Sequence, residues 1–239
     1  MELPIARSDG ALEPDGVLAR APFCAGVPVA AVAELGRRAT TVEGTRGATL
    51  YKEGSPATRL FVITRGVVKL SRALADGREV IVELAGPGDV IGEAALIADL
   101  GYGTTAVCVH PSSALAIPRE DAIAFVAAQP AAVRNVVALL HAGVRRAQQR
   151  VEDMAIFGAR QRIARFLLRL ADWSGRADSA GVLVPLALSR QELAALAGTT
   201  VETAIRVMSE LRRQGVVKAA RRGFLVSDRA ALTDLATAA

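Results

Sequence analysis

The pattern of apolar and polar positions divides the chain into three parts. Between Thr40 and Pro118, short runs rich in β-branched residues recur at roughly ten-residue spacing, with glycine, proline or aspartate turn signals between them. This spacing predicts antiparallel strands in a sandwich or barrel, and the Asp76-Gly77 dipeptide between two runs predicts a hairpin. A helical pattern follows, and beyond Gly158 further helices alternate with short strand-like segments. Residues 1–20 are polar with several glycines and prolines, which predicts a flexible arm.

Apolar residues within 129–157 recur at alternating spacings of four and three, which is a heptad pattern. Its seam consists of Val133, Val137, Leu140, Val144, Ala147, Val151 and Met154. Arginines and glutamines flank the stripe, which is narrower than the face that a helix usually buries against its own domain. We therefore predict a parallel two-stranded dimer through this helix. A single helix packed on its own domain remains the alternative.

The segment 189–213 carries the signals of two short helices joined by a tight turn. Ser189 and, three residues later, Glu192 form a capping box that begins the first helix, and Gly198 supplies the positive φ that ends it. The residues expected to face inward are Leu193, Leu196, Ala204, Val207, Met208 and Leu211. This arrangement predicts a helix-turn-helix, and the apolar segment at 216–228 predicts a hairpin that completes a winged helix.

Charge is distributed unevenly along the chain. The whole sequence has a net charge of +5, and residues 158–239 hold 13 basic against 7 acidic residues, whereas residues 1–157 hold 16 against 17. The positive excess therefore lies entirely in the last third, which contains the predicted helix-turn-helix. Such an asymmetry favours a polyanionic partner, most simply double-stranded DNA.

The run RQELAALAG followed by VETAIR resembles the recognition unit of the Crp/Fnr family of bacterial transcription regulators. Upstream, GSPATRLFVITRGVVKL and DGREVIVELAGPGDVIGEAAL resemble the effector-binding β-roll of that family. The resemblance implies an α+β fold with an N-terminal cyclic-nucleotide-binding-like β-roll, a long dimerisation helix and a C-terminal winged helix-turn-helix. The corresponding ranges are 21–128 for the β-roll, 129–157 for the helix and 158–239 for the winged helix-turn-helix, after the arm at 1–20.

The resemblance assigns base-reading roles to Glu202 and Arg206, with Val201 and Ile205 beside them. Arg206 would bond to guanine O6 and N7 and Glu202 would accept from a cytosine amino group, which implies an inverted repeat with TGxxA half-sites. Residues that match phosphate-binding positions are Ser189, Arg190, Thr200 and Thr203. Two alternatives remain: Glu202 as a capping partner and Arg206 as a solvated residue. Ile205 replaces the small polar residue usual in Fnr-type members, which leaves the outer bases undefined.

The same resemblance suggests where an effector would bind. Family members that bind cyclic AMP use a Gly-Glu pair, an Arg-Ser pair and a Thr-Ser pair on the dimer helix. Here those positions read Gly92-Glu93, Thr104-Thr105 and Ala147-Gln148. The missing arginine argues against cyclic AMP, because a buried cyclic phosphate needs that bidentate cation. An effector would act by shifting the helices at the Phe157-Gly158 hinge.

Other cofactors are constrained by the two cysteines, Cys24 and Cys108. They are too few for a disulfide framework or a cysteine-ligated iron–sulfur cluster supplied by this chain. Haem remains open, because Cys108 and His110 share one face of a strand and either could ligate iron; the alternative is a buried cysteine and a turn histidine. Redox sensing by one thiol and DNA binding without any effector also remain open.

Other classes of protein are disfavoured. The chain lacks a paired-carboxylate signature, a phosphate loop and a nucleophile elbow, so we do not expect an enzyme. It has no signal peptide and no apolar run of about 20 residues, so we expect a cytoplasmic protein without a membrane partner. Residues Asp76-Gly77-Arg78 are a candidate contact for RNA polymerase or a solvated hairpin tip. A β-roll module acting mainly through a protein partner is the alternative function.

Overall fold

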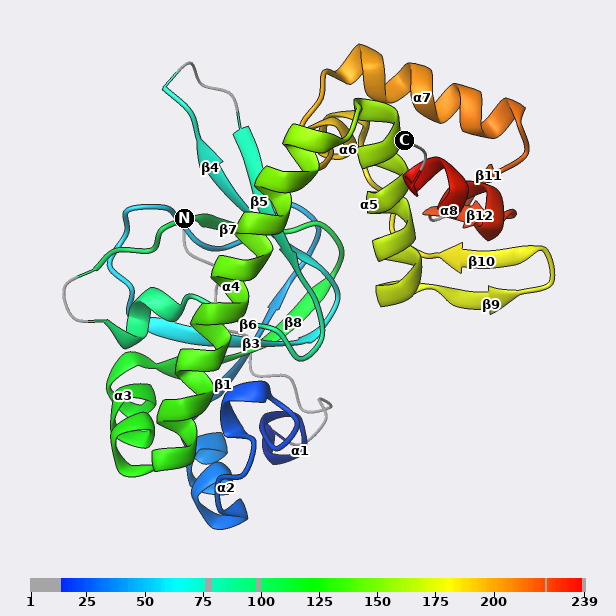
Figure 1. The fold of residues 1–239 in the computed structure, drawn as a ribbon. Coiled ribbons are helices and arrows are strands. Elements are labelled where there is room, and N and C mark those ends of the chain that lie inside the picture. Colours follow the sequence, from blue (N-terminus) through cyan, green and yellow to red (C-terminus); the bar gives the residue numbers. More distant parts are fainter. Residues whose placement is uncertain (1–13, 76–78, 98–99, 222, 238–239) are drawn as a thin grey trace. The chain divides into compact units, whose positions relative to one another are not determined.

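The chain forms two compact units in the computed structural model, residues 1–146 and 147–239 (Figure 1). The structure describes residues 14–75, 79–97, 100–221 and 223–237. The first unit combines a β-roll with short helices, and the second unit is a small helical domain with its own sheet.

The first unit begins with three short helical segments before the first strand. They are α1 (Pro14–Leu18), the 3₁₀ helix η1 (Pro22–Cys24) and α2 (Val29–Arg38). The expected flexible arm at 1–20 is therefore wrong for its second part, because Leu18 is completely buried and packs with Phe23 and Val32. Residues 1–13 lie outside the described part of the chain. Burial of Leu18 in an apolar cluster explains why a polar stretch rich in proline nevertheless becomes ordered there.

The β-roll consists of two four-stranded antiparallel sheets. In chain order the strands are β1 (Thr40–Gly44), β2 (Thr49–Tyr51), β3 (Arg59–Arg65), β4 (Val68–Ala73), β5 (Glu79–Ala85), β6 (Val90–Ile91), β7 (Thr105–Cys108) and β8 (Ser112–Pro118). One sheet has the order β1-β8-β3-β6 and the other has the order β2-β7-β4-β5. A short 3₁₀ helix, η2 (Glu93–Leu96), follows β6. Strands β4 and β5 pair as the hairpin pattern predicts, although the Asp76-Gly77 turn itself lies outside the described residues.

Strand β3 separates two apolar clusters because successive side chains point to opposite faces of a strand. Phe61 and Ile63 belong to the cluster in the interior of the roll. Leu60 and Val62 belong to a second cluster, formed with α2 and α3 (Arg119–Ala128). The sheet that contains β3 is thus covered on both faces, which fits its continuous apolar sequence.

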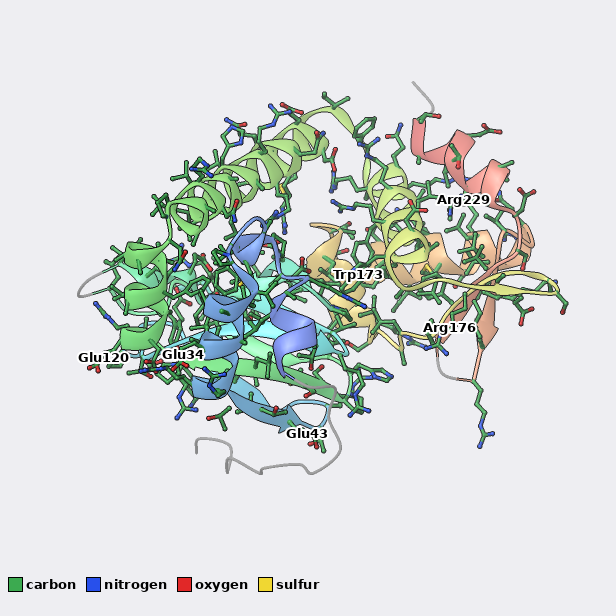
Figure 2. The ribbon with its side chains drawn as sticks, turned by 90° about the horizontal axis from the view of Figure 1, so that it is seen from below. Glu34, Glu43, Glu120, Trp173, Arg176 and Arg229 are labelled. Atoms are coloured by element: carbon green, nitrogen blue, oxygen red, sulfur yellow. The ribbon has the colours of Figure 1, made fainter. Side chains whose placement is uncertain are left out.

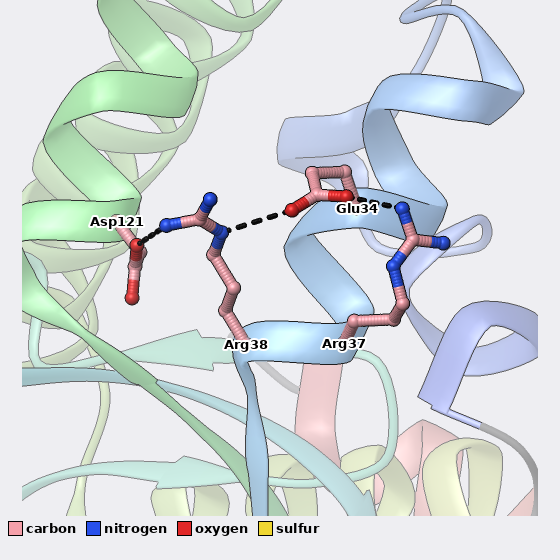
Figure 3. A network of polar contacts seen from close by, with 4 residues as sticks. All are labelled: Glu34, Arg37, Arg38 and Asp121. Atoms are coloured by element: carbon pink, nitrogen blue, oxygen red, sulfur yellow. Dashed lines mark hydrogen bonds and ion pairs between the residues drawn. The ribbon is translucent and has the colours of Figure 1, made fainter.

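A polar network joins α2 to α3 outside the second cluster (Figure 3). Arg38 donates to Asp121 Oδ1 over 2.8 Å and to Glu34 Oε1 over 3.1 Å. Arg37 also donates to Glu34, and hydrogen bonds from Arg37 and then Arg38 lower the pKa of Glu34. These groups are exposed, so the network orients the two helices more than it stabilises the unit.

The long helix predicted at 129–157 is present as α4 (Pro130–Ile156). Near its start, Asn135 Nδ2 donates to the carbonyl oxygens of Phe23 and Ala25, which ties the helix to the N-terminal segment. Among the described residues, no single helix is long and apolar enough to cross a membrane. Helices α3 and α4 reach that length and apolar composition only when they are taken together, and they are bent by 114° at the break between them.

The second unit is a helical domain closed by an antiparallel sheet. Its elements are α5 (Ala159–Ser174), β9 (Arg176–Asp178), β10 (Gly181–Val184), α6 (Arg190–Leu196), α7 (Val201–Arg213), β11 (Val217–Ala220), β12 (Gly223–Val226) and α8 (Arg229–Thr237). The sheet order is β11-β12-β10-β9. Helix α5 packs against α7 and α8, and Arg229 at the start of α8 pairs with Asp172 near the end of α5, beside Trp173 in the sequence (Figure 2).

Candidate nucleic-acid interface

Helix α6 begins at the predicted capping box. The Glu192 backbone N–H donates to Ser189 Oγ over 3.1 Å, and the Ser189 N–H donates to Glu192 Oε2 over 2.7 Å. These bonds satisfy two of the amides that a helix start leaves without partners. Ser189 and Arg190 are both exposed at this helix start.

The turn between α6 and α7 depends on Gly198. Its φ is +59°, a region that residues with a Cβ rarely adopt, and an added Cβ would lie 2.6 Å from Met154 Cε. Met154 belongs to the predicted apolar seam of α4, so the end of that helix contacts the turn of the helix-turn-helix. Both residues lie within the second compact unit.

Arg162 on α5 fixes the same turn through backbone carbonyl groups. Its Nε donates to Ala197 O over 2.8 Å and its Nη2 to Gly198 O over 2.9 Å, while its Nη1 donates to Phe157 O over 2.6 Å. One guanidinium group therefore connects the segment after α4 with the turn before α7. The sequence does not predict this role, because a single arginine on a helix carries no pattern that reveals which carbonyls it reaches.

A second arginine of α5 binds the last turns of α4. Arg165 Nη2 lies 3.2 Å from Asp153 Oδ1, and its guanidinium carbon lies 4.3 Å from the centre of the Phe157 ring. Asp153 is buried and also accepts from Gln149 Nε2 at 3.4 Å. A buried carboxylate requires such a partner, so this pair holds α4 and α5 together at the predicted hinge.

Helix α7 begins at Thr200, which accepts a hydrogen bond from the Thr203 backbone N–H over 3.3 Å. The hydroxyls of Thr200 and Thr203 are 3.2 Å apart. The backbone N–H of Glu202 itself and then the Thr200 hydroxyl lower the pKa of Glu202. Glu202 therefore interacts with the helix start at Thr200, while its side chain remains exposed. A capping box from Thr199 to Glu202 was the alternative, but the N-cap is Thr200.

The predicted base-reading residues share one exposed part of α7. Glu202 and Arg206 are both exposed and lie one helical turn apart, whereas Val201 and Ile205 are half-buried. Arg206 makes no hydrogen bond or ion pair within the part of the chain that the structure describes.

Arg160 of α5 binds polar side chains at the C-terminal end of α7. Its Nη2 lies 3.0 Å from Glu210 Oε1 and 3.5 Å from Gln214 Oε1. Further exposed basic residues surround this helix and the adjoining hairpin: Arg190, Arg212, Arg213, Lys218 and Arg221. Arg222 lies outside the described residues. The second unit thus presents basic side chains around a helix whose orientation is fixed by α5.

The predicted effector residues of the β-roll lie beside aromatic side chains. Gly92 has φ +77° and precedes η2, and an added Cβ there would lie 3.1 Å from Tyr102 Cε1. Thr104 and Thr105 are half-buried at the start of β7, and Thr105 Oγ1 accepts from the Glu53 N–H over 3.0 Å. Ala147 and Gln148 are exposed on α4.

The cysteines are buried thiols in apolar surroundings. Burial raises the pKa of Cys24 to about 12, and burial also raises the pKa of Cys108 against an opposing hydrogen bond from Ser112. The carbonyl of His110 accepts from Ser112 Oγ over 2.6 Å. Among the described residues, no group of three or more His, Cys, Asp or Glu side chains is arranged to hold a metal ion.

The chain is similar to known proteins over most of its length. Residues 42–129 match the cyclic nucleotide-binding domain, and residues 161–235 match the Crp-like helix-turn-helix domain. The chain is 32% identical over 192 residues to the Cyclic AMP receptor protein of Thermus thermophilus, covering 80% of this chain and 85% of that protein. The chain belongs to the Crp/Fnr family.

Two further Crp/Fnr relatives extend the likeness over most of the chain. The nitrogen fixation regulation protein FixK of Azorhizobium caulinodans is 31% identical over 212 residues, which span 87% of this chain and 82% of that protein. The structure of FixK2 from Bradyrhizobium japonicum is similar with a TM-score of 0.73 and 25% identity, covering 84% of this chain and 98% of that chain.

Membership of the Crp/Fnr family confirms the predicted α+β fold and identifies a DNA-binding transcription regulator. The β-roll and the helix-turn-helix occur in the predicted order along the chain. Neither of the two matched family models is that of an enzyme family.

Proposed function

We propose that this Crp/Fnr-family regulator acts as a homodimer that reads an inverted repeat with TGxxA half-sites. The observation that carries the proposal is the pair Glu202 and Arg206, exposed one turn apart in the first half of α7. Arg206 has the five donors needed for a bidentate contact to guanine, and the ionised Glu202 carboxylate accepts from the cytosine amino group. The half-buried Val201 and Ile205 offer apolar contact to thymine methyl groups on the same part of the helix.

Phosphate contacts on either side of α7 would set its register on the duplex. Ser189 accepts one backbone bond but retains its hydroxyl proton as a donor, and Arg190 beside it is exposed. Thr200 and Thr203 lie at the positive end of α7, where backbone amides favour an anion. These four residues are therefore the proposed phosphate contacts.

Dimerisation through α4 explains an apolar stripe that one chain leaves uncovered. Val133, Val137, Leu140, Val144, Val151 and Met154 are between 41% and 69% exposed. Ala147, the remaining seam residue, is also exposed. A second α4 packed in parallel would bury this stripe, and a two-fold dimer matches the symmetry of an inverted repeat.

As a DNA-binding regulator, the protein would act in the cytoplasm and affect transcription through RNA polymerase. The proposed polymerase contact at Asp76-Gly77-Arg78 lies outside the described residues. Action of the β-roll mainly through another protein partner is the second candidate function, and it predicts that Arg206 has no role.

The test is binding of purified protein to a labelled TTGAT-N4-ATCAA duplex and to a scrambled duplex at about 0.15 M salt. The N4 spacer begins with A and ends with T, so that each half-site reads TGATA. We expect preference for the palindrome and a loss of about 30-fold or more in Arg206→Ala, because the substitution removes one bidentate contact, worth about 1–3 kcal/mol, from each of the two half-sites. Arg212→Ala, on the last turn of the same helix, is the matched control and should retain the preference. Equal binding to both duplexes by the parent protein would refute the proposal.

A further inference from the structure

The interior of the β-roll beside Gly92 is filled by aromatic rings of the protein itself. Tyr51 and Tyr102 stack with their ring centres 3.9 Å apart and their planes at 16°, and Phe61 lies 5.6 Å from Tyr51. All three rings are buried. An added Cβ on Gly92 would lie 3.1 Å from Tyr102 and 3.4 Å from Phe61, so these rings contact the backbone of the Gly92-Glu93 pair.

Hydroxyl groups that would bind an effector here already bond within the protein. The Thr104 hydroxyl hydrogen-bonds to Tyr51, and Thr105 Oγ1 accepts from the Glu53 backbone N–H over 3.0 Å. The Tyr102 hydroxyl accepts from the Arg59 N–H over 3.0 Å and donates to the Arg59 carbonyl over 2.8 Å. The Tyr102 hydroxyl proton is therefore already donated within the protein, whereas Thr105 keeps its own proton as a donor.

Two carboxylates lie near this aromatic cluster. Burial raises the pKa of Tyr51, and the charges of Glu93 and then Glu83 raise it further, which places both carboxylates within electrostatic range of the Tyr51 hydroxyl. Glu93 belongs to the Gly-Glu pair that cyclic AMP-binding members also carry, so its charge does not by itself disfavour a nucleotide. The Glu83 carboxylate forms an ion pair with Arg146.

An ion pair connects the same site with the long helix. Arg146 Nε on α4 lies 2.7 Å from Glu83 Oε1 on β5, and both residues belong to the first compact unit. In family members that bind cyclic AMP, the ligand touches both the β-roll and the dimer helix. Here a residue adjacent to Ala147-Gln148 makes that connection directly.

We propose that Arg146 and Glu83 are positioning residues that couple the β-roll to the dimer helix in place of an effector, so that this regulator binds DNA without a cyclic nucleotide. A ligand shifts a conformational equilibrium only by its differential affinity for the two states. The Arg146–Glu83 ion pair would supply such a bias without a ligand by forming in the DNA-binding arrangement of the helices and not in the other. This inference rests on the proposed function where DNA binding is measured. The measurements of nucleotide binding and of thermal unfolding do not depend on it.

The first experiment measures nucleotide binding without DNA. Cyclic AMP and cyclic GMP are each titrated into the purified full chain by calorimetry up to about 1 mM, and the melting temperature is recorded with and without them. We expect no saturable heat and no change in the melting temperature. Saturable binding of either nucleotide at micromolar concentration would overturn the inference, because the aromatic cluster would then be displaced by a ligand.

The second experiment exchanges the charges of the ion pair. Binding of the TTGAT-N4-ATCAA duplex is measured for Arg146→Glu, Glu83→Arg and the double variant, with Arg145→Glu on the adjacent exposed position as the control. We expect each single variant to bind at least about two- to fivefold more weakly than the control, and the double variant to recover most of the loss. Single variants equal to the control, or a double variant as weak as the singles, would overturn the inference.

A thermal unfolding cycle separates this inference from the proposed function. Arg146→Gln, Glu83→Gln and their double variant are compared, because these neutral substitutions preserve side-chain size if the charge reversals fail to fold. Coupling between the two residues should persist in the background of Arg206→Ala, which removes DNA recognition alone. Independent effects of the two substitutions on the melting temperature would contradict the ion pair, whereas failure of the parent protein to bind the palindrome would contradict only the proposed function.

Discussion

At the scale of single residues, Arg162 determines how the helix-turn-helix is held. Three carbonyl oxygens, from Phe157, Ala197 and Gly198, accept from its guanidinium group. Arginine suits this position because its donors form a rigid planar fork, whereas a lysine ammonium would reach these oxygens only as a compact point charge. The turn before α7 is thus fixed by a side chain of α5.

Replacing Arg162 by methionine should weaken both folding and DNA binding. The substitution keeps an apolar stem but removes the donors of three backbone carbonyls, so we expect a loss of about 1–3 kcal/mol in unfolding free energy. Arg169→Met, at an exposed position of the same helix, should change stability by less than about 0.5 kcal/mol. Urea denaturation of both variants measures the difference, and equal midpoints would show that the three hydrogen bonds contribute nothing.

Cys24 should make folding sensitive to alkaline pH. Burial raises its pKa from 9.0 to about 12, so between these values the folded state retains a proton that the unfolded state has lost. The unfolding free energy contributed by this group is therefore constant below pH 9 and decreases as the pH rises toward 12. Denaturation between pH 8 and 11 should show a smaller alkaline decrease in Cys24→Ala than in the parent chain. Parallel pH profiles of the two proteins would contradict this assignment.

At the scale of elements, α4 has two kinds of surface. Its first turns are tied to the N-terminal segment by Asn135, and its apolar stripe is exposed along its length. A stripe of this kind is stabilised when a second helix covers it, because the heptad positions then interlock as knobs into holes. The element is therefore expected to determine the association state of the protein.

Introducing a charge into the seam should dissociate the dimer. Val137→Glu places a carboxylate where two stripes would meet, and we expect the apparent mass in sedimentation experiments to fall toward that of a monomer. The adjacent Ala138 is also exposed but lies outside the seam, so Ala138→Glu should leave the mass unchanged. A dimer that tolerates both substitutions equally would place the interface elsewhere.

The elements that sequence patterns predicted well are those with a buried face of regular period. Strands β3 and β8 are rich in apolar residues, α6 begins at the predicted capping box, and α7 ends at Arg213, the last residue of the predicted helix-turn-helix. Strand β9 has three exposed residues and β6 is only two residues long, so neither leaves a periodic apolar pattern in the sequence. The reading helix was recognisable from sequence, but the contacts of Arg162, Arg165 and Arg146 join segments far apart in sequence and leave no local pattern.

At the scale of the whole molecule, the N-terminal and C-terminal parts of the chain differ in net charge. The positive excess lies in residues 158–239, while the larger N-terminal part is nearly neutral. Attraction to the DNA backbone should therefore come from the second unit alone. Counterion release then makes affinity depend steeply on salt, with each phosphate contact adding to the slope.

Removing a phosphate contact should reduce the salt dependence of DNA binding without changing sequence preference. Arg190→Gln should lower the slope of log affinity against log salt by about 0.9 per lost contact, since each contact releases condensed counterions. Arg134→Gln removes the same charge from an exposed position of α4 and should leave the slope unchanged. Fluorescence anisotropy across a salt series measures both slopes, and identical slopes for the two variants would exclude Arg190 from the phosphate contacts.

The contacts of Asp153, Met154 and Phe157 also decide where the chain can be divided. Asp153 binds Arg165, Met154 lies against Gly198, and Phe157 contacts both Arg162 and Arg165. A fragment that starts at Gly158 would expose the Arg165 guanidinium and leave the Gly198 turn without its apolar neighbour. The smallest DNA-binding fragment that folds by itself should therefore start near residue 147. The last turns of α4 then belong to the DNA-binding domain as well as to the dimerisation helix.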